Sequence, residues 1–130
     1  MDNYLVWAAV LAVLIGLVHS ALGEILIFRK LRSGSLIPSR GAPPLSERHI
    51  RILWATWHVV TVFGFALAAV LFQLGSATTV ASARATVLTA TGVAFLMASI
   101  VVLIGTHGRH PGWAALAGVA VLVALGLRAA

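Results

Sequence analysis

The sequence predicts an all-α integral membrane protein, a single domain (1–130) in which four transmembrane helices form a bundle. Of the 130 residues, 61% are hydrophobic and only 9% are charged, whereas a water-soluble domain carries roughly 25% charged residues. Apolar runs of about 20 residues, the length that crosses a hydrocarbon core roughly 30 Å thick, alternate with polar connections. This composition leaves no room for a soluble domain, and we expect no nucleic-acid partner. The lack of cysteine excludes disulfides, thiolate metal sites and cysteine nucleophiles.

We expect the four spans to cover about residues 4–24, 50–72, 86–106 and 113–128. We expect the first to be a retained span, because the residues before it lack the basic region of a signal peptide and the apolar run is long for one. Small residues recur at steps of four in the first and third spans, and such stripes let helices approach closely in lipid. The stripes are Ala8, Ala12, Gly16 and Ser20, and Ala90, Ala94 and Ala98.

Basic residues set the expected orientation. Six of the nine lie from Arg29 to Arg51, in or beside the long loop 28–49. The positive-inside rule places this loop in the cytoplasm and both termini on the outer side. We therefore expect a multi-pass protein of the bacterial inner membrane, with Arg84 on the outer face. Within the loop, Ser46 follows a Pro-Pro-Leu segment and is a candidate N-cap for the second span.

Ionisable and polar residues gather towards the cytoplasmic side. His19 and His58 are expected about 7 and 6 Å to that side of the bilayer centre, at 1.5 Å per residue. Ionisable groups inside a membrane are costly and usually pair or line a site. A second depth, about 15 Å from the centre and near the headgroups, is expected to hold Glu24, Arg51, His107, Arg109 and His110. Both depths are taken together as one polar layer contributed by three segments. Its members are His19, Ser20, Glu24, Arg51, His58, Thr61, His107, Arg109 and His110.

Each of these residues also has a structural interpretation. The two intramembrane histidines could only fix helix register, and Glu24 could pair with Arg51 or Arg109 near the interface. The turn 106–112, in which Gly108 permits a positive φ, could contact headgroups. Tryptophans at the start of the second span, Trp54 and Trp57, are typical of interfacial anchors.

Three pieces of this layer resemble one family. They are His19-Ser20-Ala21-Leu22-Gly23-Glu24, Trp57-His58-x-x-Thr61 and Gly108-Arg109-His110-x-x-Trp113. Together they resemble a family of small, uncharacterised four-span membrane proteins of proteobacteria. The resemblance covers most of the chain and implies the same topology, but it implies no activity. Separately, Arg109-His110-Pro111 resembles a segment of membrane isoprenylcysteine methyltransferases, but Trp113 replaces its Tyr, and that activity is not carried over.

Several functions fit these residues. The leading hypothesis is a non-enzymatic subunit or stabiliser of a larger membrane complex or homo-oligomer, whose polar layer contacts lipids and their anionic headgroups at the cytoplasmic face. A second is a metal or haem protein, with His19 and His58 as axial ligands of haem b, or with Glu24 and His107 completing a divalent-metal site. A third is a small proton-linked transporter. A fourth is a membrane enzyme of lipid-phosphate or methyl-transfer type, although no Ser/His/Asp set or phosphate-binding loop is visible in the sequence.

Overall fold

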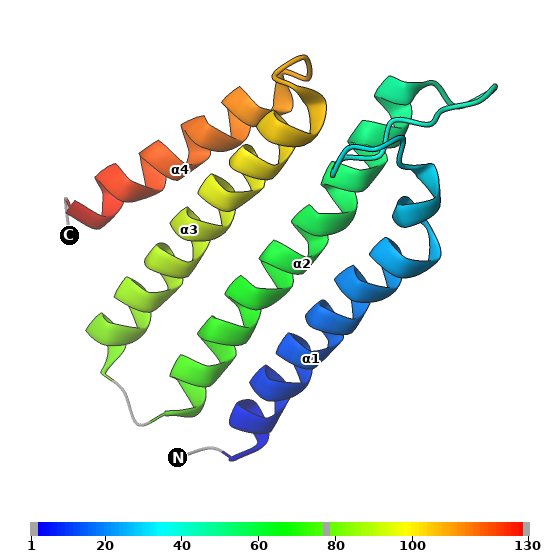
Figure 1. Ribbon diagram of the computed structural model, residues 1–130. Coiled ribbons are helices and arrows are strands. Elements are labelled where there is room, and N and C mark those ends of the chain that lie inside the picture. The colour runs from blue at the N-terminus through cyan, green and yellow to red at the C-terminus, as the bar shows by residue number, and fades with distance from the viewer. Residues whose placement is uncertain (1–2, 77–78, 129–130) are drawn as a thin grey trace.

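The computed structural model describes residues 3–76 and 79–128, and this part of the chain is helical with irregular connections. It contains four α-helices and one short 3-10 helix (Figure 1). Their bounds are α1 Asn3–Leu26, η1 Phe28–Leu31, α2 Glu47–Gly75, α3 Val80–Thr106 and α4 Gly112–Arg128. The prediction of an all-helical fold is confirmed.

The helices form an open up-and-down bundle. Each packs extensively against its neighbours in sequence, α1 on α2, α2 on α3 and α3 on α4, so that they lie in a row (Figure 1). The segment 27–46 and the turn 107–111 share one end of the row, which we call the loop end. The start of α1, the end of α2 and the start of α3 lie at the opposite end. An open row leaves large apolar surfaces on the flanks of the helices.

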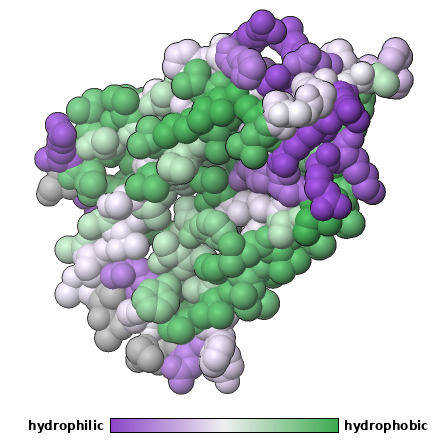
Figure 2. Space-filling model, viewed as in Figure 1, coloured by the Kyte–Doolittle hydropathy of each residue, from purple (hydrophilic) through white to green (hydrophobic). Residues whose placement is uncertain are grey.

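Three helices, α1, α2 and α3, are long and apolar enough to cross a membrane. The fourth, α4, is apolar but has 17 residues, which at 1.5 Å per residue reach about 26 Å, less than the roughly 30 Å hydrocarbon core. Most of the large apolar side chains of these helices are exposed, and they cover the visible flanks of the molecule (Figure 2). The chain therefore has the composition and shape expected of a membrane protein.

Helix boundaries differ from the predicted spans mainly at helix starts. The second helix begins at Glu47, three residues early, because Ser46 caps it as predicted: the Ser46 backbone N–H donates to Nδ1 of His49 at 3.2 Å. The third begins at Val80, because the Thr79 side chain accepts a hydrogen bond from the Ser82 backbone N–H at 3.2 Å. Hydropathy predicts only the apolar part of a helix, so the polar residues at the helix starts lie outside the predicted spans.

Small-residue stripes lie at helix contacts, as predicted. Gly16 is buried, and a Cβ on it would come within 2.7 Å of the Phe65 ring of α2. Ala94 and Ala98 of α3 are 2% and 0% exposed. Because lipid offers no hydrophobic drive for helices to associate, these close approaches are a main source of packing energy.

The turn after α3 brings α4 back along it. His107 and Gly108 both have positive φ, 53° and 72°, so the predicted left-handed residue at Gly108 is confirmed and a second precedes it. Trp113 at the start of α4 then donates its indole N–H to the Gly108 carbonyl at 3.2 Å. Ser99 of α3 donates to the Trp113 carbonyl at 2.8 Å. These contacts fix His107 at the loop end, beside the start of α2.

Candidate functional site

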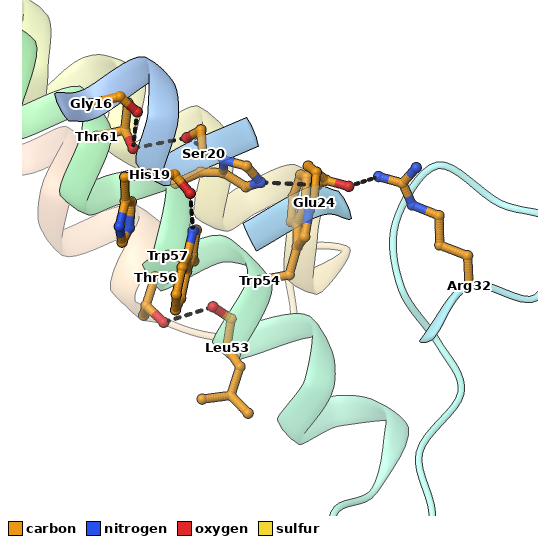
Figure 3. Close-up of polar contacts among 11 residues, drawn as sticks. Gly16, His19, Ser20, Glu24, Arg32, Leu53, Trp54, Thr56, Trp57 and Thr61 are labelled. Atoms are coloured by element: carbon orange, nitrogen blue, oxygen red, sulfur yellow. Dashed lines mark hydrogen bonds and ion pairs between the residues drawn. The ribbon is translucent and has the colours of Figure 1, made fainter. Parts of the chain in front are cut away.

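The carboxylate of Glu24 is the centre of a polar cluster between α1 and α2 (Figure 3). Its Oε1 accepts a hydrogen bond from the Trp54 indole N–H at 2.6 Å and lies 3.1 Å from Nε2 of His58. Its Oε2 forms an ion pair with Arg32, from the segment that follows η1. Three donors from α2 and the loop thus converge on one acid of α1.

The cluster continues towards the middle of the helices through hydroxyl groups. Nδ1 of His58 lies 3.1 Å from Oγ of Ser20, which lies 2.8 Å from Oγ1 of Thr61. The Thr61 hydroxyl also donates to the Gly16 carbonyl at 3.4 Å. We call the side chains of Arg32, Glu24, His58, Ser20 and Thr61 the polar chain.

Sequence spacing explains why these side chains meet. Ser20 and Glu24 are four apart on α1, and His58 and Thr61 are three apart on α2, so each pair lies on one helix face. Gly16, four residues before Ser20, removes the side chain that would hold α2 away. The polar chain is therefore encoded by two local patterns that the α1–α2 contact joins.

Two aromatic contacts hold the helices in register beside the polar chain. The rings of His19 and Trp57 stack, with centroids 4.3 Å apart and planes 8° apart. The Trp57 indole N–H donates to the His19 carbonyl at 3.1 Å. Gly23 makes room for this, since a Cβ there would lie 2.2 Å from Nε1 of Trp57. Both Trp57 and Trp54 thus bond to α1, a role that the expectation of interfacial anchors did not include.

The number of hydrogens that each group can donate limits how the polar chain can be hydrogen-bonded. An ionised Glu24 only accepts, so Nε2 of His58 must carry a proton. When His58 is neutral, Nδ1 accepts from Ser20, and Thr61 donates to Ser20. When His58 is protonated, Nδ1 donates to Ser20, Ser20 donates to Thr61, and Thr61 donates to the Gly16 carbonyl. Both orders keep the His58–Ser20 and Ser20–Thr61 hydrogen bonds, but only the second keeps the Thr61–Gly16 bond, because a hydroxyl group has one hydrogen to donate. The polar chain can pass between the two orders by reversing its hydroxyl groups.

Three members of the polar chain stand in the order serine, histidine, carboxylate, which resembles a hydrolytic triad. Sequence reasoning saw no such set, because Ser20 and His58 are 38 residues apart on different helices. The surroundings do not suit acyl transfer. Ser20 lies inside α1, whose backbone N–H groups serve the helix itself and cannot form an oxyanion hole. The arrangement fits hydrogen-bond or proton chemistry better than nucleophilic catalysis.

A second polar cluster lies at the loop end, between α2 and the turn 107–110. Nη1 of Arg51 lies 2.8 Å from Nε2 of His107, and Nε of Arg51 donates to Glu47 at 2.8 Å. A cavity of about 270 Å³ opens beside them. We call it the arginine cavity, and its lining is Ser46, Glu47, Arg48, Arg51, Ile52, Thr106, His107, Arg109 and His110.

The predicted single layer is thus divided between two clusters. His19, Ser20, Glu24, His58 and Thr61 belong to or adjoin the polar chain, whereas Arg51, His107, Arg109 and His110 line the arginine cavity. No hydrogen bond or ion pair among the described residues joins the two clusters.

The expected pairing of Glu24 with Arg51 or Arg109 is wrong. Glu24 pairs with Arg32, and Arg51 pairs with Glu47. The loop is responsible: the backbone N–H groups of Ser39 and Arg40 bond to the Leu31 carbonyl and fold the loop back on itself beside the end of α1. The proximity of Arg32 to Glu24 in the sequence, eight residues, is the only feature that could have indicated this pair.

The proposed metal ligands are not assembled as a set. The described residues contain no group of three or more His, Cys, Asp or Glu side chains placed to hold a metal ion. Both ring nitrogens of His58 face Glu24 and Ser20, so iron or another metal could bind His58 only by displacing one of them. Nε2 of His107 is occupied by Arg51. Nε2 of His19 is buried without a hydrogen-bond partner among the described residues, which leaves it as the one unengaged ligand of the four.

Comparisons with protein-family models, with curated proteins and with solved structures find no match for this chain. Its class therefore follows from its own features. It is a helical protein with three helices apolar enough to cross a membrane and two polar clusters, one between helices and one at the loop end.

Proposed function

We propose that the protein is a non-enzymatic subunit or stabiliser of a larger complex in the bacterial inner membrane. In this proposal all four helices span the bilayer, with the loop end in the cytoplasm and both termini outside. The basic residues of the loop support that orientation through the positive-inside rule. The polar chain supports a structural role, because its groups bond mainly to one another and join α1 to α2.

The observation that carries the proposal is a pair of apolar grooves in the half of the molecule away from the loop end. One has a volume of about 670 Å³ and lies between α2 and α3. The other, of about 560 Å³, lies between α1, α2 and the start of α3. Phe65, Ala69 and Thr86 line both.

Small residues make these grooves suitable for a further helix. The larger groove is lined by Ala66, Ala69, Ala85, Ala90 and Ala94, among others. In lipid, helices associate where small side chains let backbones approach closely. We therefore infer that the occupant is a transmembrane helix of a partner protein, seated against α2 and α3.

Filling the larger groove tests this. Ala69→Leu and Ala90→Leu should remove a stoichiometric partner that co-purifies with the full chain, as measured by native gels and mass spectrometry of the solubilised complex. Ala124→Leu, on an exposed part of α4 outside both grooves, is the matched control. Recovery of the chain alone, or equal retention of the partner by all three variants, would contradict the proposal.

A proton-linked transporter is the second candidate, and the polar chain specifically favours it. Reversal of its hydroxyl groups gives a route for a proton from the Glu24–Arg32 end to Gly16. The rest of α1 towards the N-terminus has no further ionisable group before Tyr4, which is why this function ranks second.

Proteoliposomes containing the full chain test the second candidate. The wild type should dissipate an imposed pH gradient, and Ser20→Ala and Thr61→Val should slow that dissipation because each interrupts the hydroxyl relay. Thr89→Val, outside the polar chain, is the control. Equal rates in all four preparations and in empty liposomes would remove proton transport from consideration.

A further inference from the structure

The arginine cavity concentrates positive charge. Its lining has three guanidinium groups, from Arg48, Arg51 and Arg109, against the single carboxylate of Glu47. His107 and His110 add ring nitrogens. Guanidinium groups present N–H donors as planar forks that match the oxygen atoms of a phosphate group and bind it in a bidentate manner.

One of the three arginines is already oriented. The Arg51 side chain is only 14% exposed, and contacts to Glu47 and His107 fix two of its nitrogens. Its remaining N–H groups add to the donors at the cavity. A positioned donor loses little conformational freedom when a ligand binds, which favours binding.

The other two arginines are unpaired. The side chains of Arg48 and Arg109 make no hydrogen bond or ion pair to any residue in the described ranges 3–76 and 79–128. They come from different elements, the first turn of α2 and the turn before α4, and meet at the same cavity. Two unpaired guanidinium groups and an oriented third line one cavity, which leaves an anion as the missing partner.

The position of the cavity indicates the kind of anion. Hydrophilic residues gather at the loop end, whereas apolar residues cover the helix flanks (Figure 2). If the helices cross the bilayer, the arginine cavity lies at the depth of the lipid headgroups, where basic side chains attract anionic lipids. We propose that the arginine cavity is a phosphate-binding site, which takes the phosphodiester of an anionic phospholipid headgroup or a free phosphate ion.

This proposal does not depend on helix docking, because the grooves and the arginine cavity share no residue. Its lipid ligand rests on the proposed insertion of the helices in the bilayer. The test uses the full chain in phosphate-free detergent and in phosphatidylcholine nanodiscs. In detergent, the affinity for inorganic phosphate is measured by calorimetric titration. The nanodiscs contain a minor fraction of phosphatidylglycerol, and native mass spectrometry counts the phosphatidylglycerol molecules that stay bound to the protein.

The decisive variant is Arg48→Gln/Arg109→Gln, which removes two cavity charges. Its matched control, Arg29→Gln/Arg40→Gln, removes two charges from exposed side chains of the same basic region outside the cavity. We expect the cavity variant to bind at least about tenfold more weakly, since each charge-assisted hydrogen bond lost is a large fraction of such a site's affinity. The control should lose much less. Arg109→Lys keeps the charge without the fork and should fall between.

Each outcome has a definite meaning. A loss confined to phosphatidylglycerol supports a headgroup site, and a loss confined to inorganic phosphate supports a site for the free ion. Equal losses in both double variants would show diffuse surface attraction and overturn the proposal. Absence of binding by the wild type, or unchanged affinity in the cavity variant, would overturn it as well.

Discussion

The two halves of the α1–α2 contact are built differently. Near the loop end, between residues 16–24 and 54–61, hydrogen bonds and a stacked ring pair join the helices. Towards the other end, the same helices are lined by apolar residues and leave a groove of about 560 Å³. The α1–α2 pair is thus joined by specific hydrogen bonds and ring stacking at one end and leaves a groove at the other.

The difference shows how a helix pair is held together in lipid. Lipid tails are as apolar as leucine, so burying apolar side chains between helices adds little, and polar bonds and close backbone approach decide where helices join. The polar chain supplies both at the loop end. The opposite half keeps its small residues uncovered, which is the condition for accepting another helix.

The substitution with the largest expected effect on stability is Glu24→Gln. It should lower the free energy of unfolding by about 3 kcal/mol, because hydrogen bonds to a charged group are each worth about 1.5–3 kcal/mol and Glu24 has three partners. Glu47→Gln should cost about 0.5 kcal/mol, because its carboxylate is exposed and its partner is an i,i+4 arginine. Titration with sodium dodecyl sulfate measures both, and similar small costs would show that the polar chain does not hold the helices.

Gly23→Ala should have the next largest effect. The added Cβ would lie 2.2 Å from Nε1 of Trp57, so the indole must move away from His19, at a cost of about 2 kcal/mol for overpacking. Gly64→Ala is the matched control on α2. Its Cβ would meet no atom within 4 Å, so it should stabilise the helix by about 0.5–1 kcal/mol. Opposite signs in thermal unfolding are the expected result, and the same sign for both would show that the Trp57 contact is loose.

Local sequence patterns were sufficient to predict much of the fold. Apolar runs gave the helices, the cap at Ser46 followed from a hydroxyl residue before a periodic segment, and steps of four gave the buried faces at Gly16 and Ala98. Each of these depends on residues within a turn or two of one another. His19 and His58 both take part in the α1–α2 contact, where His19 stacks on Trp57 and His58 lies beside Glu24.

The partners of the polar residues could not be predicted in this way. Depth along a helix does not fix rotation about its axis, so Glu24, expected at the depth of Arg51 and the turn histidines, instead bonds to His58 and Arg32. The pairing of Glu24 with Arg32 depends on how a loop with three prolines and two glycines folds back, and hydropathy carries no information about that. The indole N–H groups of Trp54 and Trp57 were assigned to the interface because composition cannot distinguish a lipid-facing tryptophan from one between helices.

The smallest expected effects come from two threonines, Thr61 in the polar chain and Thr89 in the larger apolar groove. Thr61→Val keeps the shape of a residue that is 8% exposed and removes its hydroxyl from Ser20 and the Gly16 carbonyl, so it should cost about 1 kcal/mol. Thr89→Val alters an exposed residue that lines the larger groove, and it should change stability by less than about 0.5 kcal/mol. Reversible unfolding in detergent distinguishes these values. Equal effects would mean that the Thr61 hydroxyl adds nothing to the stability of the α1–α2 contact. A role for that hydroxyl would then have to be sought in proton chemistry or in a partner.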